Sequence, residues 1–321
     1  MNALTGRAPA GGAGAPPGSA PAIDVRGLSR SFGGHTAVDA LTLAVEEGEL
    51  FGIVGPDGAG KTTTLRMLAG VLRPTAGTAL VAGVDVAADP EGVKPHIAYM
   101  SQRFGLYEDL TVRENLDFYA DLYGVPRATR PERLERLYAF SRLGEFTERL
   151  AGQLSGGMKQ KLSLSCALIH KPDILLLDEP TFGVDPISRR ELWLILHEMV
   201  AEGITIVVST SYLDEAERCD RVVLLNEGRR LALDTPTALR RSLPGRMLAI
   251  QADRPRPARD VLRDAPFVRS AYLFGDALHV LLDDGTSDDD ALEPLRSAGV
   301  TVREWETTDP SLEDVFMGLV G

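Results

Sequence analysis

The stretch "GPDGAGKTT", Gly55 to Thr63, constrains this chain more than any other feature. It fits GxxxxGK[ST], the pattern of a loop that wraps phosphate groups. The apolar run "LFGIV" precedes it, and "TTTLRMLAG", with apolar residues at helical spacing, follows. Glycines let backbone N–H groups converge on phosphate oxygens at a helix N-terminus. The sequence therefore predicts a strand, a phosphate loop and a helix in succession.

The residue types at two positions of this loop predict specific contacts with a nucleotide and its metal ion. Lys61 supplies a compact ammonium to the β- and γ-phosphates of a nucleotide, and Thr62 offers a hydroxyl to Mg²⁺. The remaining positions contribute mainly backbone groups. The predicted phosphate-binding set is Gly55, Pro56, Asp57, Gly58, Ala59, Gly60, Lys61, Thr62 and Thr63.

The stretch "ILLLDEP" predicts a buried strand that ends in two carboxylates. Asp178 is placed to join the Mg²⁺ shell, and Glu179 to orient and polarise the attacking water. On its own, such a run also fits an ordinary strand with a solvated turn. Because a phosphate loop and more than a hundred residues precede it, we predict an active site here.

A third motif, "LSGGMKQ", opens a predicted helix. Ser155 fits a helix N-cap, which is the ordinary interpretation. Alternatively, Ser155, Gly156 and Gly157 present a hydroxyl and bare N–H groups at the positive end of a helix dipole and form a second anion site. That site would serve the nucleotide of another subunit, with ATP held between two chains.

The rest of the chain predicts an α/β fold. Continuous apolar strands alternate with helices, which favours a mainly parallel sheet covered on both faces. After residue 243 the order becomes β-α-β-β-α-β plus a last helix, typical of a ferredoxin-like α+β domain. We predict a disordered Ala/Gly/Pro-rich tail over 1–22, a nucleotide-binding domain over 23–243 with a helical region over about 95–170, and an accessory domain over 244–321.

Composition excludes several classes of protein. The net charge of −12 argues against nucleic-acid binding, which needs clustered cations. No run approaches the roughly 18 to 20 apolar residues of a membrane span, so membrane contact is expected through a partner. Cys166 and Cys219 have no metal-like spacing, and we expect neither a disulfide nor a function for them.

Taken in order, the motifs of residues 23 to 240 resemble the ATP-binding cassette (ABC) family. The resemblance makes "GPDGAGKTT" the Walker A motif, "LSGGMKQK" the signature and "ILLLDEP" the Walker B motif of a P-loop NTPase with a RecA-like core. It implies that Phe32 in "SFGG" stacks on adenine and that Gln102 in "YMSQ" contacts metal or water. Asp185 in "GVDP" takes the D-loop position.

The C-terminal part, ending "PSLEDVF", resembles the extension on ATPase subunits of drug-type and ABC-2-type exporters. The resemblance implies a subunit that binds ATP and Mg²⁺, hydrolyses ATP and powers a separate permease exporting a drug-like, lipid or other hydrophobic substrate. A second ABC subunit, identical or different, would complete a dimer at the cytoplasmic face of the membrane. Aromatics after Gln102 either pack a core or dock the permease.

Two positions depart from the family pattern. Ser211, before "YLDEAE", stands where the family has a switch histidine that contacts the γ-phosphate, and a serine hydroxyl is shorter and uncharged. Asp57 stands where asparagine is usual and puts a negative charge on the phosphate loop. We therefore expect slow hydrolysis, with Glu179, Lys61, Gln102 and Ser211 as catalytic residues. Alternatives are a catalytically weak regulatory half of an asymmetric dimer and, less favoured, a non-transport ABC protein.

Overall fold

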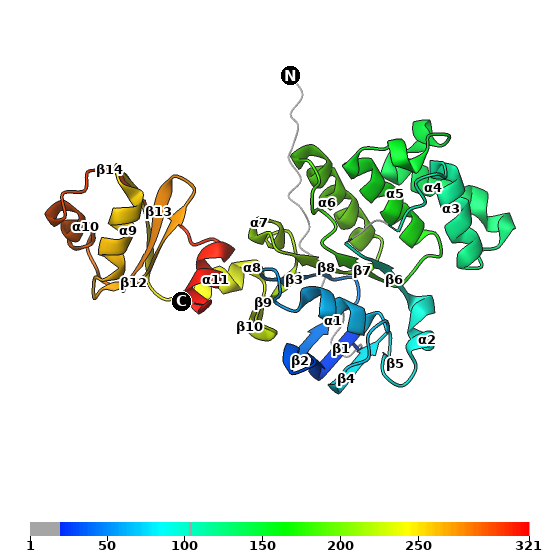
Figure 1. Ribbon diagram of the computed structural model, residues 1–321, viewed down its shortest axis with the longest axis horizontal. Helices are drawn as coiled ribbons and strands as arrows, with labels where there is room; N and C mark the ends of the chain where they lie inside the picture. The colour runs from blue at the N-terminus through cyan, green and yellow to red at the C-terminus, as the bar shows by residue number, and fades with distance from the viewer. Residues whose placement is uncertain (1–19, 103–104, 321) are drawn as a thin grey trace, which may run out of the picture.

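The structure is a computed structural model that describes residues 20–102 and 105–320 (Figure 1). Residues 1–19 of the predicted N-terminal tail lie outside the described residues. At the start of the described chain, Ala22 is buried and its carbonyl accepts a hydrogen bond from the Ala82 N–H. Ala22 therefore packs as part of the fold.

A six-stranded sheet forms the centre of the fold and confirms the predicted, mainly parallel sheet. The strand order is β10-β9-β3-β8-β7-β6, and only the β10–β9 pair is antiparallel. Its strands are β3 (Leu50–Val54), β6 (Ile97–Met100), β7 (Ile174–Asp178), β8 (Thr205–Thr210), β9 (Arg221–Asn226) and β10 (Arg229–Asp234).

Both faces of this sheet are buried, which explains the continuous apolar runs. In β3, Leu50 and Val54 face one hydrophobic core, whereas Phe51 and Ile53 face another. Helix α6 (Pro186–Ala201) packs into the first core, and α1 (Lys61–Leu68) packs into the second. The two helices therefore lie on opposite sides of the sheet (Figure 1).

A separate antiparallel sheet covers the side of α1, in the order β2-β1-β4-β5. It comprises β1 (Ile23–Phe32), β2 (His35–Val45), β4 (Ala76–Val81) and β5 (Val84–Asp85). The sequence indicated strands here but not that they form a second sheet. The alternation inside β2 is the physical signal, because Val38, Leu41, Leu43 and Val45 are buried while residues between them are more exposed.

The predicted helix-rich region is confirmed between β5 and β7. The sequence "TVRE" begins one of its helices with a capping box between Thr111 and Glu114. The elements are α2 (Pro90–Val93), η1 (Lys94–His96), α3 (Val112–Leu122), η2 (Arg127–Thr129), α4 (Arg130–Ser141), η3 (Gly144–Phe146), η4 (Ala151–Gln153) and α5 (Gly156–Leu168).

The C-terminal part has the predicted ferredoxin-like order of elements. Its antiparallel sheet runs β12-β13-β11-β14, and α9 and α10 contribute to the core on one of its faces. The elements are β11 (Arg246–Ala252), α9 (Pro255–Arg263), β12 (Val268–Phe274), β13 (Ala277–Leu282), α10 (Asp288–Ser297) and β14 (Val302–Thr307).

The last helix joins the two parts of the chain. Helix α11 (Leu312–Val320) contacts β12 and also packs against α7 (Leu213–Ala216) and α8 (Pro236–Ser242). Leu312 and Val315 of α11 belong to the same hydrophobic core as α5 and α6. In Figure 1, α11 accordingly lies between the ferredoxin-like sheet and the central sheet.

Candidate active site

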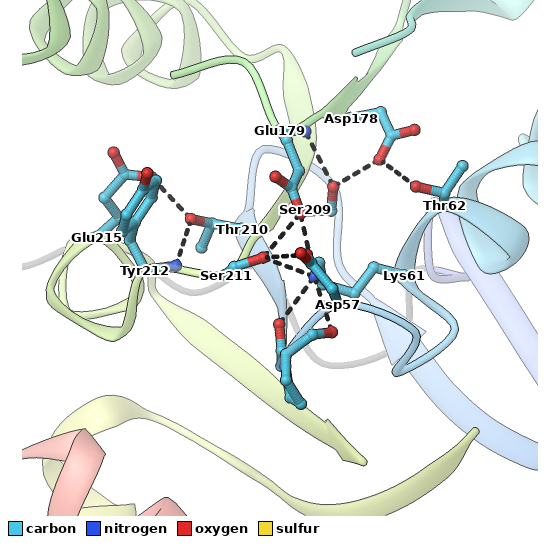
Figure 2. A network of polar contacts seen from close by, with 12 residues as sticks. Asp57, Lys61, Thr62, Asp178, Glu179, Ser209, Thr210, Ser211, Tyr212 and Glu215 are labelled. Carbon is cyan, nitrogen blue, oxygen red and sulfur yellow. Dashed lines mark hydrogen bonds and ion pairs between the residues drawn. The ribbon is translucent and has the colours of Figure 1, made fainter. Parts of the chain in front are cut away.

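Part of the predicted site comes together at the carboxyl ends of β3, β7 and β8, where Figure 2 shows Asp57, Lys61, Thr62, Asp178, Glu179 and Ser211. The loop after β3 turns sharply into α1, and Gly60 there has φ of 100°. A Cβ at Gly60 would lie 2.5 Å from the carbonyl oxygen of Ala37, so a larger residue fits neither the backbone nor the space. The glycine spacing of the motif is thus a requirement of this turn.

Lys61 is at the centre of the site and is 4% exposed. Its ammonium lies 2.8 Å from the carbonyl oxygen of Gly55, 3.1 Å from that of Pro56 and 2.8 Å from Ser211 Oγ. It also forms an ion pair of 3.0 Å with Glu179 Oε1 (Figure 2). The three N–H protons of the ammonium therefore face four acceptors.

Glu179 has an unusual backbone. Its φ of 48° lies in the left-handed region, which costs a non-glycine residue on the order of 1–3 kcal/mol. Hydrogen bonds from the Glu179 N–H to Ser209 O at 3.2 Å and Ser209 Oγ at 3.0 Å hold this conformation. The turn directs the carboxylate toward Lys61 and Ser211, as Figure 2 shows.

Asp178 is 1% exposed and accepts hydrogen bonds from neutral groups. Its Oδ1 accepts from Thr62 Oγ1 at 2.9 Å and Ser209 Oγ at 2.8 Å, and its Oδ2 accepts from the Tyr99 hydroxyl at 3.2 Å. Within residues 20–102 and 105–320, no ion pair neutralises this buried carboxylate. Hard oxygen donors around an uncompensated buried negative charge suit Mg²⁺.

Tyr99 was not identified from the sequence. Burial, and then the nearby Asp178 carboxylate, raise the pKa of Tyr99 to about 12. The phenol consequently remains protonated and donates to Asp178 across the physiological range. An aromatic residue at the end of a short strand carries no sequence signal for this function; only the pairing of β6 beside β7 brings it there.

The three consecutive hydroxyl residues after Val208 each have a different carboxylate partner. Ser209 donates to Asp178, Thr210 donates to Glu215 Oε2 at 2.8 Å, and Ser211 lies 2.8 Å from Glu179 Oε1. Glu215, which is 1% exposed, also accepts from Thr181 at 2.8 Å. Sequence reasoning missed Ser209 and Glu215, although three hydroxyls at a strand end were the available signal.

Two predicted residues lie at the surface. Phe32 is 45% exposed at the end of β1, and the Arg30 guanidinium lies 4.5 Å from its ring centroid. Gln102 is exposed and follows β6. In the described part of the chain, neither side chain has a hydrogen bond to Lys61, Glu179 or Ser211. An exposed aromatic ring remains accessible for stacking on a base.

The signature and D-loop residues lie next to one another. Ser155 caps α5 by accepting from the Met158 N–H at 3.3 Å, and Asp185 caps α6 by accepting from the Ile187 and Ser188 N–H groups. Hydrogen bonds from Ser188 lower the pKa of Asp185, so it is ionised. A Cβ on Gly157 would lie 2.3 Å from Ser188 Cβ, which shows how closely the two helix starts approach.

The remaining sequence expectations concern cysteines and membrane spans. Cys166 and Cys219 are free and buried, and burial raises the pKa of both thiols. Among the helices of residues 20–102 and 105–320, none has the length and apolarity that a bilayer crossing requires.

Family models match both parts of the chain. Residues 38–182 match "ABC transporter", and residues 235–320 match "ATP-binding protein DrrA1-3-like, C-terminal domain". A "Probable multidrug ABC transporter ATP-binding protein YbhF" of Escherichia coli is 45% identical over 304 residues, which cover 93% of this chain. The chain spans about half the length of that relative, because the alignment covers 52% of it.

Other relatives match over nearly their whole length. The "Daunorubicin/doxorubicin resistance ATP-binding protein DrrA" of Streptomyces peucetius is 37% identical over 305 residues, covering 94% of this chain and 92% of that protein. A solved "ATP binding subunit of ABC transporter" is 34% identical with a TM-score of 0.62, covering 68% of this chain and 92% of that one. The motifs, the fold and these similarities agree, and the chain belongs to the ABC transporter family of ATP-binding proteins.

Proposed function

We propose that this chain binds ATP with Mg²⁺ and hydrolyses it to drive a separate membrane permease that exports a drug-like, lipid or other hydrophobic substrate. The single observation that supports this most is the convergence of Lys61, Glu179 and Ser211 beside the buried Asp178. Relatives with export in their names, such as the "Nod factor export ATP-binding protein I" of Burkholderia lata, support the direction of transport.

Each side chain has a separate task in this proposal. Lys61 exchanges Glu179 and carbonyl oxygens for phosphate oxygens, which frees the Glu179 carboxylate to orient and polarise a water molecule. Thr62 and Asp178 would hold Mg²⁺, which when bound would supply positive charge beside the phosphates. Gln102 approaches the metal or the water, and Phe32 stacks on the adenine.

A second ABC subunit completes the site. Helix α5, which Ser155 caps, packs into the core on the opposite face of the central sheet from α1, which begins at Lys61. Ser155 and Gly156 are exposed. These positions favour a nucleotide held between the loop 55–63 of one chain and the Ser155–Gly157 turn of another, with Asp185 beside it.

The permease docks on the helical region, in our proposal. Exposed large side chains there include Tyr107 at 48%, Leu122 at 62% and Tyr123 at 41%. Tyr107 and Phe118 form an edge-to-face pair with ring centroids 4.5 Å apart. Exposed aromatic side chains suit a protein interface. Docking there places the chain peripherally at the cytoplasmic face of the membrane.

Domain limits also belong to this proposal. We divide the chain into an ATP-binding domain over 23–243, with its helical subdomain over about 95–170, and an accessory domain over 244–321. The separate core beneath β11–β14 supports the division. Helix α11 connects the two domains, because its residues Leu312 and Val315 pack into the core of the ATP-binding domain.

Hydrolysis should be slow because Ser211 replaces the histidine. Loss of one preorganised donor typically costs roughly 3 kcal/mol, or about 10²-fold in rate. The Ser211 hydroxyl does reach Glu179 Oε1 at 2.8 Å, but it has one proton and no charge. Similarity to ATP-binding proteins named for multidrug transport and drug resistance favours neither a catalytically weak regulatory half nor a non-transport ABC protein.

Two variants test the function. Glu179→Gln should abolish hydrolysis and trap a dimer with ATP and Mg²⁺, because the amide holds water without accepting its proton; light scattering of the loaded protein measures this. A monomer under these conditions contradicts the shared site.

Ser211→His should raise ATPase turnover with the copurified permease, and no rise counts against the explanation of slow hydrolysis.

A further inference from the structure

The two positions that depart from the family pattern, Asp57 and Ser211, contact each other although 153 residues separate them along the chain. Ser211 Oγ lies 3.3 Å from Asp57 Oδ1, and Figure 2 shows both side chains beside the Lys61 ammonium. Asp57 is exposed at the tip of the phosphate loop, and Gly58 after it has φ of 82°. In residues 20–102 and 105–320, Ser211 is the one side-chain hydrogen-bond partner of the Asp57 carboxylate.

The Ser211 hydroxyl has more acceptors around it than it can serve. It accepts from Lys61 at 2.8 Å, and its single proton faces both Glu179 Oε1 at 2.8 Å and Asp57 Oδ1 at 3.3 Å. A hydroxyl donates one hydrogen bond. Ser211 therefore has two possible orientations, one donating to each carboxylate.

These orientations have different consequences for Glu179. A proton donated by Ser211 occupies a lone pair on Oε1 and stabilises the negative charge, which makes Glu179 a weaker base. A proton directed to Asp57 leaves that lone pair for water. The proton stays on the Ser211 oxygen in both cases, so only its direction changes.

We propose that Asp57 is a positioning residue that draws the Ser211 proton away from Glu179 and so leaves Glu179 available to the attacking water. This inference rests on the proposed ATPase function and extends it by one residue. In this chain, aspartate at the loop tip and serine after β8 act as a pair.

The Asp57 carboxylate also weakens nucleotide binding in this proposal. Lys61 is the single cation in contact with this cluster among the described residues, whereas Glu179 and Asp57 both carry negative charge there. Removing the exposed Asp57 charge lowers repulsion of a triphosphate, by an amount that salt screens. Asp57 therefore affects affinity and turnover in opposite directions, which a purely structural residue does not do.

The test is a double-mutant cycle between Asp57→Asn and Ser211→Ala, assayed in the full chain with its permease. In the natural background, Asp57→Asn should lower kcat about 3- to 10-fold, because an amide oxygen is a weaker acceptor than a carboxylate. It should also tighten the Kd for MgATP, measured by calorimetry, about 3- to 10-fold at low salt. In the Ser211→Ala background, the kcat effect should vanish while the Kd effect remains.

A matched control uses Asp173→Asn. Asp173 precedes β7, at the opposite end of the strand from Asp178, and its side chain is 69% exposed and pairs with His96. This variant removes the same charge away from the phosphates and should change neither kcat nor Kd. If Asp57→Asn and Asp173→Asn change kcat and Kd to a similar extent, net charge accounts for the effect and the proposal is overturned.

Two further outcomes are distinguishable. Equal kcat effects of Asp57→Asn in both backgrounds, or none in the natural one, overturn the pairing and leave the ATPase function intact. A natural chain without Lys61-dependent hydrolysis overturns the proposed function, and the pairing with it.

Discussion

Removing the Asp314 carboxylate should destabilise the C-terminal part of the chain and loosen its attachment. Asp314 of α11 is 1% exposed and accepts four hydrogen bonds. They come from the hydroxyl of Tyr272, from His279 Nδ1 at 2.7 Å, and from the backbone N–H and the hydroxyl of Ser311, both at 2.6 Å. Since α11 also packs into the core of the ATP-binding domain, this carboxylate connects the ferredoxin-like sheet to the rest of the chain.

The expected magnitude follows from the partners that would be left behind. Tyr272 and His279 are each 9% exposed, so Asp314→Ala leaves two nearly buried donors without an acceptor, at about 1–3 kcal/mol each. Half-buried Ser311 can turn to water. Burial raises the pKa of Asp314, so the variant also regains part of the cost of burying a charge. The expected net decrease in the free energy of unfolding is about 2–4 kcal/mol.

Urea unfolding followed by tryptophan fluorescence measures this loss. The chain has two tryptophans: Trp193 is buried in α6, and Trp305 is 43% exposed in β14, so each part has its own reporter. Asp314→Ala should shift the Trp305 transition to lower urea. The control is Glu313→Ala, the exposed neighbour on α11, expected within about 0.5 kcal/mol of the natural protein. A loss no larger than that of the control would refute the reasoning.

Two predictions concern the ATP-binding domain. Gly157→Ala should cost about 1–3 kcal/mol, because the new Cβ would lie 2.3 Å from Ser188 Cβ and Oγ, and adding Ser188→Gly should recover most of it in urea unfolding. If the double variant recovers nothing, the clash is not the cause. Burial lowers the pKa of His170 in the folded protein below its ordinary value of 6.5. The neutral imidazole therefore contributes its whole stabilisation above pH 6.5, and this contribution is lost as the pH falls from 6.5 toward the lower pKa of the folded state. His170→Gln should therefore shrink the difference in unfolding free energy between about pH 7.5 and about pH 5.5, and an unchanged difference would argue against His170 as its source.

The sequence by itself determined the order of elements and the chemistry of the central loop. The glycine and lysine spacing of 55–63 has few structural solutions, since Gly60 must adopt a left-handed φ beside the Ala37 carbonyl. Continuous apolar runs such as "ILLL", alternating with helical patterns, predicted strands buried on both faces, because helices cover both faces of a parallel sheet. These features are local, so the chain encodes them within a few residues.

Only the tertiary structure decided which distant residues meet. Strand order places Ser209 opposite Asp178 in the β7–β8 pairing, and it brings Tyr99 from β6 to the same carboxylate. Contact between Asp57 and Ser211 likewise depends on β3 and β8 being neighbours. Hydrogen bonds act over about 3 Å, whereas these residues are separated by 31 to 154 positions, so their partners are fixed by strand pairing rather than by local pattern.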